Sequence, residues 1–176
     1  METKHEIITR QLPKTGQVTS YADGDDGYYQ KGWWKGLTVA GNKTRFVSKT
    51  LDGDDVVIDL ATGLMWPADA EGAGGNSKNT VNWDTAIAYA NGLDFAGFTD
   101  WRIPNSHEFV TLMNLEQTVN KVPTGFFTGF GGIIEYWTST TYSDNTPYAY
   151  ELSQLDATIK VKAKTTENFS ICVRTI

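Results

Sequence analysis

The chain has 176 residues, a formal net charge of −6 and a pI near 4.8. Hydrophobic residues make up 40% of it and aromatic residues 12%, which is enough to build the core of one domain of this length. An acidic chain is repelled by phosphate backbones, so its charge argues against a nucleic-acid partner. The charge also argues against sulfated polysaccharides, unless a local basic patch or a bound cation intervenes.

Residues 1–50 are polar and contain frequent glycines that interrupt any long element. We expect an irregular lead-in with short strands, packed onto the main domain by the aromatic pairs Tyr28-Tyr29 and Trp33-Trp34. The main domain is expected over residues 51–176.

The main domain begins with a hairpin pattern. Apolar residues alternate over residues 56–61, the Thr62-Gly63 pair predicts a tight turn, and residues 64–66 predict the returning strand. A glycine-rich loop follows over residues 71–80.

Two helices are predicted next. Asn82 can cap a helix that ends between Gly92 and Gly97. After an extended link, Asn105 and Glu108 have the spacing of a capping box at the start of a second helix.

The remainder of the chain reads as β structure after a long loop over residues 117–135. Strands are expected over residues 136–141, 148–155, 159–164 and from residue 169 to the end. In the third of these, apolar residues alternate with lysines, which predicts a strand with its apolar face buried and its lysines in solvent: Ile159, Val161 and Ala163 against Lys160, Lys162 and Lys164. A hairpin, two helices and an antiparallel meander together predict an α+β fold.

The N-terminus and the single cysteine add two expectations. Residues 1–10 lack the apolar core of a signal peptide, and no apolar run approaches the ~18 residues of a membrane-spanning helix. Cys172 can form no internal disulfide. Its strand context predicts a buried, inert thiol, with a disulfide between two copies as the alternative.

Motifs of catalysis are absent from the sequence. No nucleophile elbow, P-loop or dinucleotide fingerprint is present, and His107 is the only reasonable histidine base for serine hydrolase chemistry. We therefore expect a protein without enzymatic activity.

An acidic segment could hold a cation. Asp52, Asp54 and Asp55 are oxygen ligands in a flexible stretch, which calcium prefers. Aspartate and glycine also dominate ordinary turns, so a plain turn is the alternative. Calcium is the one cofactor that this pattern suggests.

The aromatic residues divide into two groups. Four tryptophans sit in periodic or extended elements and are expected in the core: Trp66, Trp83, Trp101 and Trp137. The rings in or beside loops could stack on sugars, contact a protein, or pack their loops onto the body: Trp33, Trp34, Tyr142 and Tyr148.

Several short motifs occur in a fixed order over about residues 50–176. They are VIDLATGLMW at 57–66, a helix of the form WxxAxxYA from Trp83, AGFTDWRIP at 96–104, YWTST at 136–140 and CVR at 172–174. In these motifs the chain resembles the Lcl C-terminal domain family, named after the end domain of a bacterial collagen-like adhesin.

The resemblance implies a C-type-lectin-like fold and an adhesive activity, often on an exported or surface-displayed protein. The adhesin domain itself is described as trimeric and as a binder of sulfated glycosaminoglycans. This chain departs from that picture because it is acidic and its only dense basic stretch is Lys160, Lys162 and Lys164.

The motif residues are expected to be scaffold. Asp100 and Arg102 flank a tryptophan, where a paired aspartate and arginine can fix a loop, and Arg174 can act likewise beside the terminal strand. Recognition is expected in loops on the scaffold. The first candidate is the 142–148 loop, with ligand contacts from Tyr142, Asp144, Asn145 and Tyr148. A second is the last turn, with Glu167 and Asn168.

Three functions remain open from the sequence. The first is a non-enzymatic adhesion module that recognises a glycan or a protein receptor, on a bacterial surface or a phage tail. The second is an architectural subunit, such as the homotrimeric cap of a fibre. The third is an enzyme distantly like the formylglycine-generating enzymes, which work through reactive cysteines or a thiolate-bound metal.

Overall fold

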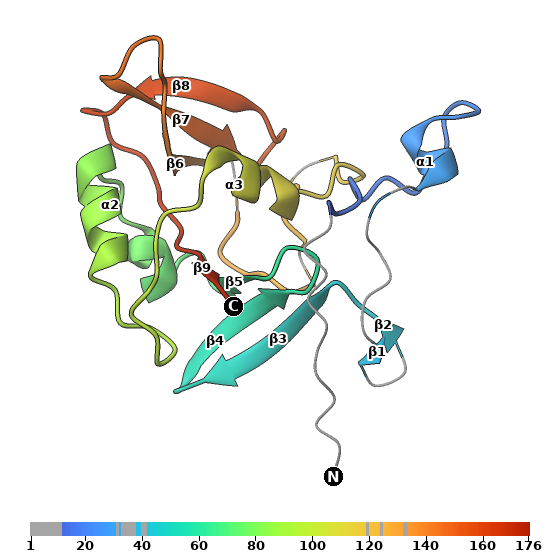
Figure 1. The fold of residues 1–176 in the computed structure, drawn as a ribbon, viewed down its shortest axis with the longest axis horizontal. Coiled ribbons are helices and arrows are strands. Elements are labelled where there is room, and N and C mark those ends of the chain that lie inside the picture. Colours follow the sequence, from blue (N-terminus) through green and yellow to red (C-terminus); the bar gives the residue numbers. More distant parts are fainter. Residues whose placement is uncertain are drawn as a thin grey trace.

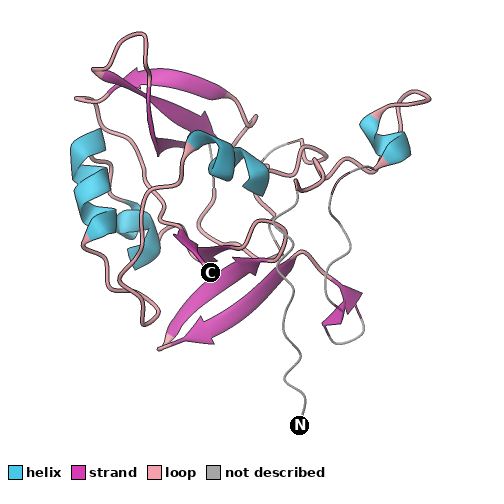
Figure 2. Ribbon diagram, in the orientation of Figure 1, coloured by secondary structure: helices cyan, strands magenta, loops and turns pink. Residues whose placement is uncertain are grey.

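Two antiparallel sheets form the body of the protein (Figures 1 and 2). The computed structural model describes residues 12–30, 32, 38–39, 42–118, 120–123, 125–131 and 134–176. Short helices lie beside the sheets, and much of the chain is loop. The α+β class is therefore confirmed.

The first sheet has the strand order β3-β4-β5-β9. Its strands are β3 (Phe46–Leu51), β4 (Asp54–Asp59), β5 (Leu64–Pro67) and β9 (Arg174–Thr175). The β4–β5 hairpin lies where the alternation predicted it, and Gly63 adopts a φ of 72° in its turn. Strand β3 starts within the stretch expected as lead-in and pairs with β4 along its whole length.

The second sheet is a meander of β6 (Glu135–Thr141), β7 (Tyr148–Ser153) and β8 (Ile159–Ala163), so its three strands are confirmed. The fourth predicted strand is not continuous. Residues 169–173 run extended and make isolated bridges, such as Arg102 with Val173, and only β9 beyond them joins a sheet.

Both predicted helices are present with their caps. The side chain of Asn82 accepts a hydrogen bond at the start of α2 (Trp83–Asn91), and Asn105 and Glu108 form the capping box of α3 (Ser106–Leu112). Two shorter elements are α1 (Asp26–Tyr29) and a 3-10 segment, η1 (Ala73–Lys78). A small ladder pairs β1 (Thr38–Val39) with β2 (Asn42–Lys43).

The two helices pack on opposite faces of the second sheet. Ala86 and Ala90 of α2 share a buried cluster with Trp137 and Ala149. Phe109 of α3 belongs to a different cluster, with Tyr136 and Leu152. Because neighbouring residues of a strand point to opposite faces, Tyr136 and Trp137 place α3 and α2 on the two sides of β6.

The lead-in attaches to the domain differently from the expectation. The carboxylate of Glu116 accepts a hydrogen bond from the N–H of Val18 (3.1 Å), and the Leu115 N–H donates to Thr15 (2.7 Å). Tyr28 and Tyr29 are both more than half exposed, so they do not anchor it as predicted. Trp33 and Trp34 lie outside the described residues.

Three of the four tryptophans expected in the core, and the cysteine, are buried as predicted, whereas Trp83 is only partly buried. Trp66, Trp101, Trp137 and Cys172 are buried, and burial raises the pKa of the Cys172 thiol to about 12. Within the described ranges, no helix has the length and apolar character needed to cross a bilayer.

Candidate ligand-binding surface

Lys162 of β8 and Lys164, directly after it, turn toward the body of the protein, which reverses the prediction for these two lysines. The Lys164 ammonium lies 4.0 Å from the centre of the Trp83 ring and donates to the Thr141 hydroxyl at 2.8 Å. The Lys162 ammonium lies 5.9 Å from the centre of the Trp137 ring. In these contacts the ammonium groups are attracted to the ring faces, and the aliphatic part of each lysine side chain is shielded from water.

Acidic partners complete the inner face of β8. Lys162 lies 3.5 Å from the buried carboxylate of Glu151, and Lys160 pairs with Glu135 at 3.1 Å. The expected wet face is therefore wrong for Lys162 and Lys164, which rings, a hydroxyl and a carboxylate hold on the inner side, whereas Lys160 stays half exposed. The only dense basic stretch of the sequence is neutralised within the fold.

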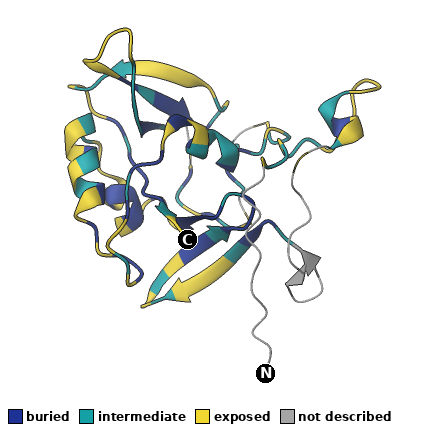
Figure 3. Cartoon of the chain, viewed as in Figure 1, coloured by how far each residue is buried: buried dark blue, intermediate teal, exposed yellow. Residues whose placement is uncertain are grey.

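The apolar residues of β8 consequently point outward. Ile159 is 41% exposed and Val161 46% exposed, and Figure 3 shows the strand as exposed over much of its length. Val161 lies opposite Tyr150 of β7 in the register, so the two share the outer face. An exposed pair of β-branched residues on an edge strand is a candidate contact surface.

The predicted recognition loop borders the same face. The ring of Tyr142 packs edge to face on Tyr150, with centroids 5.6 Å apart, and Tyr148 is exposed at the start of β7. We call Tyr142, Tyr148, Tyr150, Ile159 and Val161 the outer tyrosine patch.

Backbone hydrogen bonds hold the 142–148 loop in one shape. The Tyr142 N–H donates to the carbonyl of Tyr148 (2.9 Å), and the Asn145 N–H donates to the carbonyl of Tyr142 (3.2 Å). The Tyr142 hydroxyl donates to the Asp144 carboxylate (3.1 Å), and this bond raises the pKa of Tyr142. Asp144 and Asn145 are exposed beside the patch, so the loop is preorganised for contact.

A groove separates the patch from the first turn of α3. It has a volume of about 400 Å³ and is lined by Asn105, Ser106, His107, Thr140, Tyr150 and Ile159. The groove and the patch share Tyr150 and Ile159 and form one continuous surface.

Of the second pair of predicted ligand contacts, Glu167 lies at the surface and Asn168 in the interior. Glu167 is exposed and accepts a hydrogen bond from the Thr80 hydroxyl (3.0 Å). Asn168 is only 3% exposed and donates to the buried Glu151 carboxylate (2.8 Å). Asn168 is therefore a structural residue, and its assignment as a ligand contact was wrong.

The three aspartates of the expected calcium site have separate structural roles. Asp52 and Gly53 form the two-residue β3–β4 turn, with φ of 49° and 90°. The carboxylate of Asp54 accepts the Ala96 N–H (2.9 Å), and that of Asp55 accepts the Thr50 hydroxyl (2.6 Å). Among the described residues no group of three metal-ligating side chains is assembled, so the turn reading describes this segment.

The charged residues of the DWR motif pair with more distant partners than expected. Asp100 accepts two hydrogen bonds from Arg174 (2.7 and 3.1 Å), and Arg102 donates two to Glu108 (both 2.7 Å). The Trp101 indole donates to the Phe95 carbonyl (2.9 Å). The motif therefore fastens the link between the helices to both β9 and α3.

One buried ion pair had no counterpart in the predictions. Arg45 donates to both carboxylate oxygens of Asp59 (2.8 and 2.6 Å) and to the carbonyl of Thr111 (2.7 Å). Asp59 also accepts from the Thr62 hydroxyl, so it ties β4 to its turn and to α3. Asp59 lies inside the quoted VIDLATG motif, but nothing in the sequence pointed to Arg45 as its partner.

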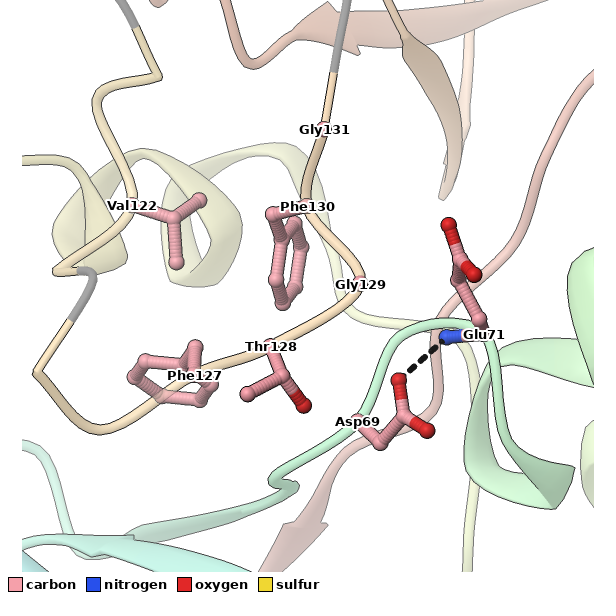
Figure 4. Close-up of a pocket in the computed structure, with 8 residues that line it drawn as sticks. All are labelled: Asp69, Glu71, Val122, Phe127, Thr128, Gly129, Phe130 and Gly131. Carbon is pink, nitrogen blue, oxygen red and sulfur yellow. Dashed lines mark hydrogen bonds between the residues drawn. The ribbon is translucent and has the colours of Figure 1, made fainter.

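A larger cleft of about 480 Å³ lies where the chain after β5 meets the 122–131 loop (Figure 4). Phe127 and Phe130 line it, with Asp69 and Glu71 at one side. The carboxylate of Asp69 accepts the Glu71 N–H (2.9 Å), and Glu71 forms an ion pair with Lys78. These carboxylates are engaged within the protein.

Gly129 explains why the two segments meet so closely at this cleft. Its φ is 76°, and a Cβ at this position would lie 2.5 Å from the Asp69 carboxylate. The Thr128 N–H donates to Ala68 (2.8 Å), and Thr128 accepts from Ala70 (3.0 Å). We regard this cleft as a junction between two loops and the outer tyrosine patch as the candidate site.

The predictions found half of this surface. Tyr142 and Tyr148 were singled out, but Tyr150, Ile159 and His107 were not. Alternation along β7 and β8 places Tyr150 with Val161, but it does not say which face is exposed. The run of three lysines was the one sequence feature that bears on which face is exposed, because lysines that face inward require nearby acidic groups or rings.

Comparisons with known proteins agree with the motifs. No curated protein matches the chain. The model of the Lcl C-terminal domain matches residues 55–174. This match spans both sheets from β4 onward and includes α2 and α3. The chain belongs to the Lcl C-terminal domain family.

Proposed function

We propose that this protein is a non-enzymatic adhesion module that binds a surface ligand through the outer tyrosine patch. The observation that carries the proposal is the outward turn of Ile159 and Val161 beside three tyrosines. Large rings that are partly exposed on or beside a strand offer contact area at low entropic cost. Family membership supports an adhesin-like role.

The proposal extends to fold type and location. We propose a C-type-lectin-like arrangement, supported by the pairing of the last strand, β9, with β5 of the first hairpin. We also propose that the domain acts outside the cytoplasm, on a cell surface or a virion, where an adhesin meets its ligand.

Cysteine chemistry receives no support from the geometry. The Cys172 thiol is buried and its pKa is raised to about 12 by that burial. A thiol of this kind is protonated at neutral pH and closed to a substrate, whereas a nucleophile must be an accessible thiolate. This supports a binding role over an enzyme of the formylglycine-generating type.

An assembly role is the second candidate, and β8 favours it. This strand is the outer edge of its sheet, and Ile159 and Val161 are exposed on it. Unprotected edge strands pair with other chains. Light scattering would decide: a stable oligomer disrupted by Val161→Lys supports assembly, and a monomer at micromolar concentration opposes it.

Binding to intact bacterial and animal cells tests the principal proposal. The double variant Tyr142→Ala/Tyr148→Ala should lose most of the binding, and Tyr21→Ala, an exposed ring outside the patch, should keep it. Circular dichroism would confirm that both variants are folded. Equal binding by the double variant and the wild type would place the contact surface elsewhere.

A further inference from the structure

We propose that the groove between α3 and the outer tyrosine patch binds an uncharged pyranose unit, so that the protein selects neutral over sulfated glycans. This inference rests on the proposed adhesive function and names its ligand class. It assigns a role to Asn105, His107 and Tyr150, which the sequence predictions did not include.

The groove has the size and surface of a small-ligand site. Its volume of about 400 Å³ lies within the roughly 300–1,000 Å³ range of small-molecule pockets. Tyr150 and Ile159 line one side and present a ring and an aliphatic surface. Such a surface suits the C–H face of a sugar ring, which stacks on aromatic side chains.

Hydrogen-bonding groups with few protein partners also line the groove. Within the described part of the chain, the Tyr150 hydroxyl, the His107 ring nitrogens and the amide nitrogen of Asn105 form no hydrogen bond with the protein. The Thr140 hydroxyl accepts the Ser106 N–H (3.1 Å) and donates a longer bond of 3.4 Å to the Ser106 hydroxyl. Together these groups donate and accept, as the hydroxyls of a neutral sugar require.

The charges nearest the groove argue against a sulfated ligand. Lys162 and Lys164 point to the opposite face of the sheet, where rings and oxygen atoms hold them. Arg102, close to α3, is paired with Glu108 through two hydrogen bonds. The carboxylate of Asp144, beside the patch, would repel a sulfate group. Recognition of sulfate normally requires arginine or lysine groups that are free to bind it.

The test compares each neutral polysaccharide with its sulfated derivative. Dextran and dextran sulfate, and galactan and its sulfated form, would be immobilised and probed at about pH 8, above the usual titration range of histidine. We expect measurable binding to at least one neutral member and binding at least about tenfold weaker to its sulfated form, a difference of about 1.4 kcal/mol. Affinity for the neutral sugar should change less than about twofold between low and high salt, because no counterions are released.

Variants assign the binding to the groove. Tyr150→Ala should weaken binding about tenfold or more, and Tyr150→Phe, which keeps the ring and the fold, should weaken it only a few-fold. His107→Ala should also weaken it, and Tyr21→Ala should not.

The outcomes separate this inference from the proposed function. Cell binding that depends on Tyr142 and Tyr148 but survives Tyr150→Ala and His107→Ala would overturn the groove and leave the adhesive function standing. Preference for the sulfated sugars, with affinity that falls steeply in salt, would overturn the neutral ligand. Cell binding destroyed by protease and resistant to periodate would identify a protein receptor and overturn it as well. Loss of all cell and sugar binding by the wild type would remove both proposals.

Discussion

The ammonium group of Lys164 lies 4.0 Å from the centre of the Trp83 ring, joining the end of β8 to the first residue of α2. This contact and its two neighbours explain the exposure of Ile159 and Val161. Because rings and oxygen partners hold Lys162 and Lys164 on one face of the sheet, the alternate residues Ile159 and Val161 lie on the other face, where both are partly exposed.

Replacement of Lys164 by Met should lower the free energy of unfolding by about 0.5 to 1 kcal/mol, because the cation–π contact is lost while the stem is kept. Lys49→Met is the matched control, since Lys49 is an exposed lysine of β3 for which no ion pair or ring contact is found within the described residues. Urea unfolding measures both. Equal stability of the two variants would show that the Trp83 contact contributes nothing.

Breaking the Arg45–Asp59 pair should be far more costly. Both side chains are buried, so Arg45→Met leaves the Asp59 carboxylate without its main partner and should destabilise the protein by about 3 to 5 kcal/mol. The double variant Arg45→Met/Asp59→Leu should recover part of that loss, because no buried charge remains. A double variant less stable than Arg45→Met would contradict this account.

The contribution of Glu108 should depend on pH. Burial acts to raise the pKa of this carboxyl, but the hydrogen bonds from Arg102 and from the Asn105 N–H outweigh it, and the pKa is lowered. Since the folded state holds the lower pKa, the stabilisation is complete above the ordinary value of 4.5 and is lost as the pH falls through the folded value.

Glu108→Gln should therefore be less stable than the wild type at neutral pH, by about 1 kcal/mol after allowance for solvent screening. The gap should close as the pH falls below about 4. Asp94→Asn, on an exposed residue, should show no such trend. Thermal unfolding across this pH range tests the sign, and a gap that widens in acid would refute it.

The Cys172 thiol should be unreactive in the folded protein. Its burial keeps it protonated and out of reach, so a thiol reagent should label it only after denaturant is added. Rapid labelling under native conditions, or a disulfide-linked dimer on a non-reducing gel, would show that the core around β9 opens readily.

Local patterns predicted the elements of this fold well. The side chains of Asn82, Asn105 and Glu108 form hydrogen bonds with backbone groups a few residues away. Their capping roles can therefore be predicted from local sequence spacing. Gly63 marked the β4–β5 turn because glycine readily adopts the positive φ found there. Strand pairing within the meander followed because consecutive strands with short connections usually lie side by side.

Ion pairs between residues far apart in the chain could not be predicted from local sequence spacing. Asp100 finds Arg174 and not the nearby Arg102, because the fold brings β9 beside the link between the helices. Arg45 and Asp59 meet for a similar reason. The outward face of β8 was missed because alternation defines two faces, and only tertiary neighbours such as Trp83 decide which of them is buried.

The position of β9 near the end of the family domain delays completion of the first sheet during synthesis. Strand β5 pairs on one side with β4, which precedes it in the chain, and on the other side with β9 (Arg174–Thr175). Ile176 also donates its N–H to the carbonyl of Gly63. During synthesis the first sheet therefore waits, incomplete along β5, until residues 174–176 have left the ribosome. Truncation before Arg174 would remove the partner of Asp100 together with the strand that pairs with β5.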